Sequence, residues 1–168
     1  MATATPGTQL RRQATTSLPP VVHVHAGDVV TAADPTRMVT ILGSCVAVCL
    51  YDPESGVAGM NHFLYPDSET RQNGDRARFG EGAILELLGS VLERGARREL
   101  LRAKVFGGAC PKSDQRWRGQ RTGARNVETA LATLSRMRIP VTAKDVGGTN
   151  GRRVEFHTGD TSVYVKRV

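Results

Sequence analysis

The sequence predicts a single α/β domain in which a mixed, mainly antiparallel sheet packs with helices. A length of 168 residues is typical of one domain. Short apolar runs of strand length recur along the chain, bounded by glycine, proline and aspartate. Two further segments repeat their apolar residues at helical spacing instead. Because strands and helices alternate along the second half of the chain, we expect the helices to cover a sheet.

The first twenty residues show none of these periodicities. Residues 1–20 are rich in Thr, Pro, Ala and Arg, and no apolar stretch follows Arg11 and Arg12. We therefore expect a mobile tail here rather than a secretory signal, and a folded domain over residues 21–168. The sequence has no run of about 18 apolar residues, so we expect a soluble cytoplasmic protein without membrane insertion.

The first half of the domain is predicted to form strands, at 21–25, 37–42, 45–51 and 57–64. The last two flank a turn cluster that contains proline and glycine, which predicts a hairpin. If the turn comprises residues 52–55, Tyr51 pairs with Gly56 and Cys45 lies directly opposite His62. A loop one residue longer would turn the two side chains to opposite faces.

The second half alternates between helices and strands. We expect helices at 82–94 and 126–137, and strands at 100–106, 141–146, 154–157 and 163–168. Gly95 stands where a helix C-terminal glycine belongs, and Asn126 is expected to cap the second helix at its N-terminus. Loops are expected at 67–78 and 111–125, where the chain is polar and contains glycine.

The cysteines argue against a disulfide framework and against zinc. There are three of them, Cys45, Cys49 and Cys110, and an odd number without dense spacing does not form a bridged scaffold. The pair four residues apart lacks the second pair that a structural zinc site needs. We therefore expect no metal and no cofactor.

The chain is basic, with a formal net charge of +7. Solvated basic surface and attraction to an acidic protein partner explain this equally well. No nucleic-acid-binding motif accompanies the charge, so nucleic acid is the weakest candidate for a partner.

One cysteine and one histidine suggest chemistry. Cys45 follows Gly43–Ser44, where glycine allows a substrate to approach the backbone amides. An imidazole such as that of His62 can take the thiol proton, and the thiolate then attacks a carbonyl carbon. Without further information, an inert buried cysteine and a structural histidine remain the alternatives. The other three histidines have no cysteine nearby in the sequence and are predicted to have no role.

Five segments, in order, resemble the motifs of the CheD family. They are LGSCVAVCLYD at 42–52, GMNHFLYP at 59–66, KVFGGA at 104–109, GARN at 123–126 and DVGGTNGRRVEF at 145–156. The similarity extends over about residues 21–168. It implies a fold related to deamidating toxins of the cytotoxic necrotising factor type.

The resemblance also implies roles for particular residues. The family nucleophile corresponds to Cys45 and the family histidine to His62. The third catalytic residue, a threonine shortly before the Gly-Ser-Cys segment, corresponds to Thr40, while Val39 stands at the position of an ungapped match. Backbone groups around Gly43 and Ser44 are expected to bind the substrate or the oxyanion.

The activity that the resemblance implies is hydrolysis of glutamine side chains to glutamate on methyl-accepting chemotaxis receptors. A CheC-like phosphatase is a further partner that it implies. Two alternatives use the same scaffold: a receptor methylesterase or other cysteine amidase, and an adaptor that binds such a phosphatase without catalysis. A basic RNA-binding module is a more distant one.

Overall fold

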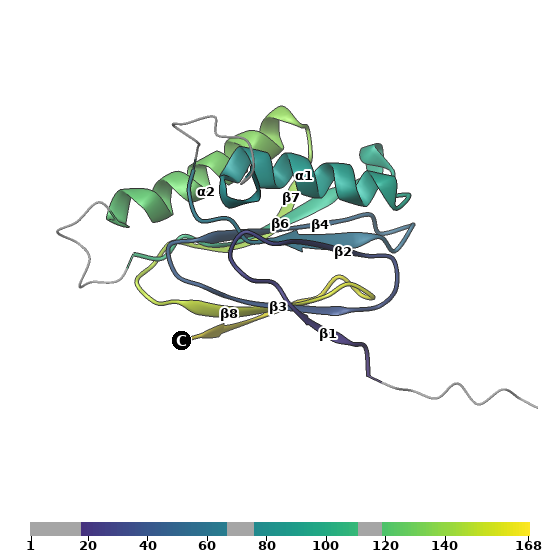
Figure 1. Cartoon of the computed structure of the whole chain (residues 1–168), viewed down its shortest axis with the longest axis horizontal. Helices are drawn as coiled ribbons and strands as arrows, with labels where there is room; N and C mark the ends of the chain where they lie inside the picture. The colour runs from purple at the N-terminus through teal and green to yellow at the C-terminus, as the bar shows by residue number, and fades with distance from the viewer. Residues whose placement is uncertain (1–17, 67–75, 111–118) are drawn as a thin grey trace, which may run out of the picture.

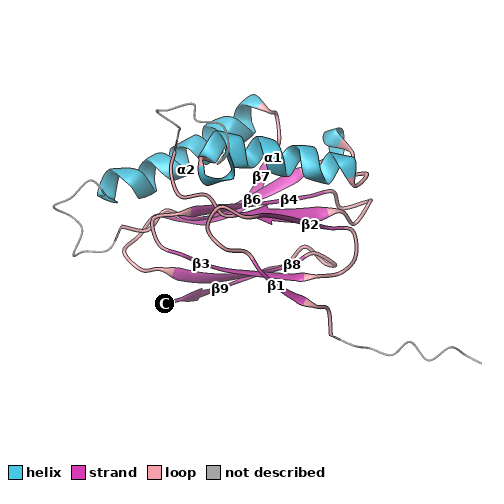
Figure 2. Ribbon diagram, viewed as in Figure 1, coloured by secondary structure: helices cyan, strands magenta, loops and turns pink. Residues whose placement is uncertain are grey.

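The computed structural model describes residues 18–66, 76–110 and 119–168, and these form three layers (Figure 1). Two helices cover one face of a five-stranded sheet, and the other face of that sheet packs against a four-stranded sheet (Figure 2). We call the five-stranded sheet the middle sheet and the four-stranded one the outer sheet. No helix in the described ranges is long and apolar enough to cross a membrane.

The middle sheet has the strand order β2-β5-β4-β6-β7. Its strands are Val29–Ala32 (β2), Val46–Tyr51 (β4), Ala58–Asn61 (β5), Arg102–Gly107 (β6) and Val141–Val146 (β7). The outer sheet has the order β1-β3-β8-β9. Its strands are Val21–His23 (β1), Arg37–Leu42 (β3), Arg152–His157 (β8) and Val163–Arg167 (β9). Only the β1–β3 and β6–β7 pairs of these two sheets are parallel.

The predicted fold class, α/β with mainly antiparallel pairing, is therefore confirmed, but the expectation of one sheet is wrong. The short segment 43–45 carries the chain from β3 in the outer sheet to β4 in the middle sheet. Consecutive strands usually pair, and that tendency is broken here. β4 is apolar along its whole length because both of its faces are covered, one by the helices and one by the outer sheet.

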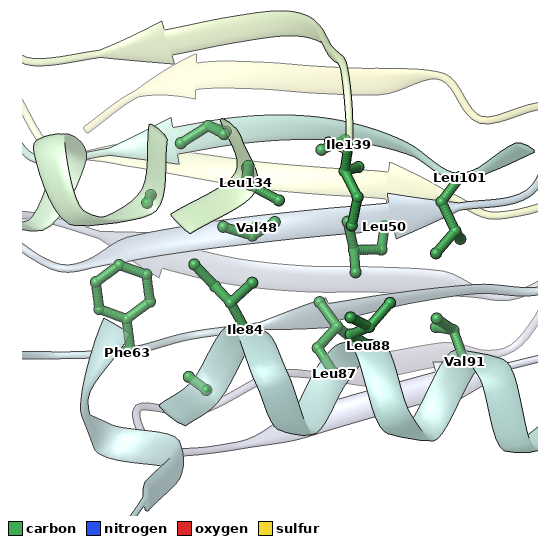
Figure 3. Packing of buried hydrophobic residues seen from close by; sticks show 14 of the residues in the cluster. Val48, Leu50, Phe63, Ile84, Leu87, Leu88, Val91, Leu101, Leu134 and Ile139 are labelled. Atoms are coloured by element: carbon green, nitrogen blue, oxygen red, sulfur yellow. The ribbon is translucent and has the colours of Figure 1, made fainter. Parts of the chain in front are cut away.

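The two cores follow the alternation of side chains along β4. Val46, Val48 and Leu50 point to the helix side, and Ala47, Cys49 and Tyr51 point to the outer sheet. On the helix side they meet one apolar face of α1, which spans Gly80–Glu93 and contributes Ile84, Leu87, Leu88 and Val91 (Figure 3). Gly95 follows this helix with φ = +100°, as the C-terminal glycine was predicted to do.

The second helix is longer than predicted. α2 spans Gly119–Arg136, so the expected loop at 111–125 is wrong from Gly119 onward, and its earlier part lies outside the described residues. Asn126 is an interior residue of this helix rather than its cap. Its side chain bonds to two other segments, described below, and these tertiary contacts explain why a residue with poor helix propensity stands there.

Smaller differences concern short elements. Strand β2 was not predicted, because its four residues are only partly buried and carry no clear alternation. Of the loop expected at 67–78, residues 76–78 form a 3₁₀ turn, and a second such turn at Arg98–Leu100 precedes β6. The remainder of that loop and most of the predicted tail, residues 1–17, lie outside the described residues.

Candidate active site

The loop between β3 and β4 presents Cys45. The thiol is half-buried, directly before the first residue of β4. Two backbone bonds hold this loop from the β6 end: the Gly108 amide donates to the Cys45 carbonyl and the Ala109 amide to the Gly43 carbonyl, both at 2.8 Å. Gly107, with φ = +113°, lies so close that an added Cβ would collide with the Cys45 carbonyl oxygen.

The predicted register of the β4–β5 hairpin is wrong by two residues. Tyr51 pairs with Ala58, not Gly56. The loop is longer because Asp52 organises it: the Asp52 carboxylate accepts bonds from the Glu54 and Ser55 amides, and the Asp52 amide donates to the Val57 carbonyl.

A shift of two residues preserves the face on which each side chain lies. The bridge between Val46 and Phe63 continues the observed register, and both residues belong to the helix-side core. His62, next to Phe63, therefore faces the outer sheet, as does Cys45, which packs against the core between the sheets. Cys45 and His62 are therefore diagonal neighbours across the two strands rather than directly opposite each other. Cα atoms in such positions lie about 7–8 Å apart.

Thr40 meets His62 across the two sheets. Thr40 lies on β3 in the outer sheet, and its Oγ1 is 2.9 Å from Nδ1 of His62. The same hydroxyl donates its single hydrogen to the Val24 carbonyl at 2.7 Å. Thr40 must then accept from His62, so Nδ1 carries the proton and Nε2 is left with its lone pair. The imidazole is thus held in the tautomer that a general base at Nε2 requires.

Nε2 of His62 is buried and has no hydrogen-bond partner among the described residues. The Cys45 thiol packs against the core between the sheets and is not hydrogen bonded to Nε2 in this structure. Burial lowers the pKa of His62, opposed by the Val24 carbonyl and by Asp28. Burial also raises the pKa of the Cys45 thiol, and the backbone amide of Cys45 partly offsets this. Both groups are therefore neutral at rest at neutral pH.

The backbone amides of Ser44 and Cys45 lie in the loop that carries the thiol from β3 to β4. None of the backbone hydrogen bonds among the described residues uses the amide of Ser44 or of Cys45. These amides are therefore candidate donors to the oxyanion expected near Gly43 and Ser44.

Asn126 was not predicted as a site residue. It is fully buried, and its Nδ2 donates to the Ser44 carbonyl and to the Leu64 carbonyl, each at 2.9 Å. The sequence held a signal for it, because a polar residue interrupts the apolar face of α2 next to Val127 and Ala130. That signal was interpreted as a helix cap.

A pocket of about 240 Å³ reaches the Thr40–His62 pair. His23, His25 and Arg153 also line it, whereas Cys45 does not. The pocket is therefore lined by the Thr40–His62 pair and not by the Cys45 thiol. His23 and His25, predicted to have no role, lie near the site. His157 lies elsewhere, bonded to Glu155 on the outer sheet.

The comparisons with known proteins agree with one another. The profile of the family described as "CheD chemotactic sensory transduction" matches residues 64–167. The chain is 49% identical over 148 residues to "Probable chemoreceptor glutamine deamidase CheD 1" of Anaeromyxobacter dehalogenans, covering 88% of this chain and 84% of the relative. It is 36% identical to "Probable chemoreceptor glutamine deamidase CheD" of Sulfurimonas denitrificans, covering 87% and 93%.

Among solved structures, the chain is similar to the Bacillus licheniformis hypothetical protein YfiH. The TM-score is 0.43 and the sequence identity 15%, covering 73% of this chain and 51% of that one.

Proposed function

Because the chain belongs to the CheD family of chemotactic sensory transduction proteins, we propose that it hydrolyses glutamine side chains of chemoreceptors to glutamate, with Cys45 as the nucleophile and His62 as its base. Relatives that share 49% and 36% of their aligned residues carry the name chemoreceptor glutamine deamidase. The observation that carries the residue assignment is the Thr40–His62 hydrogen bond. It leaves Nε2 of His62 with its lone pair, as a base that takes the Cys45 proton requires.

The reaction begins with a proton transfer from the Cys45 thiol to Nε2 of His62. The sulfur attacks the carboxamide carbon of glutamine, and the Cys45 amide donates to the oxyanion that forms. The carbon–nitrogen bond then breaks, and Nε2 returns its proton to the departing ammonia. This leaves a thioester between Cys45 and the substrate.

Water completes the reaction. Nε2 takes one proton from the water as it attacks the thioester carbon, and the carbon–sulfur bond breaks. The proton on Nε2 returns to the sulfur, so the resting thiol and imidazole are restored. One water is consumed, and the carboxylic acid that forms loses its proton to the released ammonia, so the products are a carboxylate side chain and an ammonium ion.

The electrostatics support a mechanism that starts from a neutral pair. A buried thiol with a raised pKa is weakly reactive toward general electrophiles, since the thiolate is the nucleophile. Activation must then accompany substrate binding, when the charge pair that forms on Cys45 and His62 is stabilised by the substrate and the oxyanion donor. Thr40 orients the ring through this step, because its hydroxyl can only accept from Nδ1.

A receptor assay in water enriched in oxygen-18 tests the proposal. A cytoplasmic chemoreceptor fragment from the same organism is incubated with the protein, and its peptides are examined by mass spectrometry. Glutamine converted during the assay gains about 3 Da in total: about 1 Da because oxygen replaces the amide nitrogen, and about 2 Da more because that oxygen is oxygen-18. The label separates conversion by the enzyme from glutamate that was already present.

Two variants and one control assign the residues. Cys45→Ala and His62→Ala are expected to remove the labelled product. Cys49→Ala, which truncates a fully buried side chain further along the same face of β4, is expected to keep it. Methanol released from a methylated receptor in place of ammonia would show a methylesterase instead. Labelled glutamate that survives Cys45→Ala would contradict the assignment of the nucleophile.

A further inference from the structure

Asn126 links the two segments that hold the proposed catalytic pair. It lies in α2, on the helix side of the middle sheet, and so does not face the space between the sheets where Cys45 and His62 point. One of its contacts is Ser44, directly before the nucleophile, and the other is Leu64, two residues after the histidine. The Val46–Phe63 bridge also joins these two segments.

The orientation of the Asn126 amide is determined by its partners. Both partners are carbonyl oxygens at 2.9 Å, and a side-chain NH₂ group has two hydrogens, one for each. A flipped amide would place Oδ1 against both oxygens. Oδ1 itself is buried and has no partner among the described residues. Within the described part of the chain, Asn126 therefore makes two hydrogen bonds through Nδ2 while Oδ1 makes none.

The helix approaches the loop closely enough for this contact because of Gly123, one turn earlier. A Cβ at Gly123 would lie 2.8 Å from the Gly108 carbonyl oxygen and 3.0 Å from that of Ala109. These residues in turn donate to the carbonyls of Cys45 and Gly43. In the GARN segment, Asn126 therefore contacts the nucleophile loop directly through Ser44. Gly123 lets α2 approach Gly108 and Ala109, which are themselves hydrogen bonded to that loop.

The contact at Ser44 has a specific chemical consequence. The Ser44 carbonyl and the Cys45 amide belong to one planar peptide group. A hydrogen bond to the oxygen fixes the orientation of that plane and polarises the group, which strengthens its N–H as a donor. We infer that Asn126 is a positioning residue for the oxyanion: it holds and polarises the peptide whose N–H, that of Cys45, binds the oxyanion in acyl transfer.

This inference rests on the proposed role of Cys45 as the nucleophile, and two small electrophiles test it without a receptor. Iodoacetamide alkylates a thiolate at a saturated carbon and forms no oxyanion. p-Nitrophenyl acetate acylates the thiolate through a tetrahedral oxyanion. Both reactions need the thiolate, but only acylation forms an oxyanion. The ratio of the acylation rate to the alkylation rate therefore reports how well the oxyanion is stabilised. All proteins carry Cys110→Ser, so that Cys45 gives the signal, because Cys49 is fully buried.

Asn126→Asp preserves the shape of the side chain and removes both donors. We expect the ratio to fall about 10- to 100-fold, less than the complete loss of an oxyanion donor would cause. Glu128→Gln, the opposite exchange at an exposed position of the same helix, is the matched control and should leave the ratio unchanged. If Asn126→Asp does not fold, Asn126→Ala removes the donors without introducing a charge and is expected to lower the ratio similarly.

A purely structural role gives a different result. It would lower the melting temperature, but in the folded protein, assayed well below that temperature, both rates would change by the same factor and the ratio would stay within about twofold of the parent value. A constant ratio in a folded Asn126 variant would overturn the inference. A reduced ratio in a protein that converts no receptor glutamine would leave the inference standing and refute the proposed substrate instead.

Discussion

Replacing Thr40 by valine tests the core of the proposed site. Valine has nearly the shape of threonine, so the packing between the two sheets is kept while the hydroxyl is lost. Two hydrogen bonds disappear: the donation to the Val24 carbonyl at 2.7 Å and the acceptance from Nδ1 of His62 at 2.9 Å. At about 1 kcal/mol each, their loss should lower the free energy of unfolding by roughly 2 kcal/mol.

The effect on catalysis should be moderate, for a reason visible in the structure. Nδ1 of His62 also lies 3.5 Å from the Val24 carbonyl, which Thr40→Val leaves without its donor. The Nδ1 hydrogen can move to that oxygen, so the tautomer survives while the ring tilts away from its productive position. We expect kcat to fall about 10- to 100-fold, equivalent to roughly 1.4–2.7 kcal/mol, rather than the 10⁴ or so that a wrong tautomer costs a serine protease triad.

The assay is ammonia release from the receptor fragment, beside thermal unfolding. Thr158→Val is the control, because Thr158 is equally buried and its hydroxyl accepts from the Thr36 amide at 2.9 Å, in the loops beyond β3 and β8. It should lower stability comparably and leave kcat unchanged. Thr40→Ser should keep most of the activity. If Thr40→Val retains full kcat, or if Thr158→Val loses as much, Thr40 does not orient the base.

Three further outcomes follow from the same structure. Iodoacetamide should label Cys45 slowly at neutral pH and faster as the pH rises past 9.0, since burial raises the pKa of this thiol, whereas labelling that is already fast near pH 7 would contradict a neutral resting thiol. The acid limb of kcat/KM should have its midpoint below 6.5, because the lowered pKa of His62 keeps the base unprotonated to lower pH; a midpoint above that value in a pH titration would refute the assignment. Burial raises the pKa of Asp52, but hydrogen bonds from the Arg97 amide and from the Glu54 and Ser55 amides of the hairpin loop outweigh it and lower the pKa to about 2. The contribution of Asp52 to stability, about 2 kcal/mol, is therefore present above pH 3.8 and is lost as the pH falls toward 2. Asp52→Asn should therefore be less stable than the parent at pH 7 in urea unfolding, and the difference should shrink below about pH 4.

Much of the secondary structure could be predicted because local patterns determine it. The bounds of β3 and β7 coincide with the predicted ones, and α1 begins two residues earlier and ends one residue earlier than predicted. In these elements the apolar spacing and the flanking turn residues both indicate the same state. Alternation along a strand reports which faces are buried, but it does not report which strand lies beside it. The division into two sheets was therefore not predictable from periodicity.

The site was predictable in part. The resemblance of the Gly-Ser-Cys segment to a known family indicated Cys45 and His62, and the structure places Thr40, rather than Val39, against the imidazole. The hairpin register was wrong because the carboxylate of Asp52 stabilises a longer loop than the minimal turn. Asn126 was missed because its value depends on contacts with Ser44 and Leu64, which lie far from it in the sequence.

The outer sheet has a consequence for how the protein becomes active during synthesis. Its β3 strand, which carries Thr40, pairs on one side with β8, and the register places Thr40 beside Val154. A growing chain that has not yet emerged as far as β8 contains Cys45 and His62 but cannot complete the sheet that presents the threonine. Under the proposed mechanism, most of the domain must therefore leave the ribosome before Thr40 can orient the imidazole. Chains that end before β8 hold the thiol and the histidine without the ordered threonine, and we expect them to hydrolyse glutamine more slowly than the complete domain.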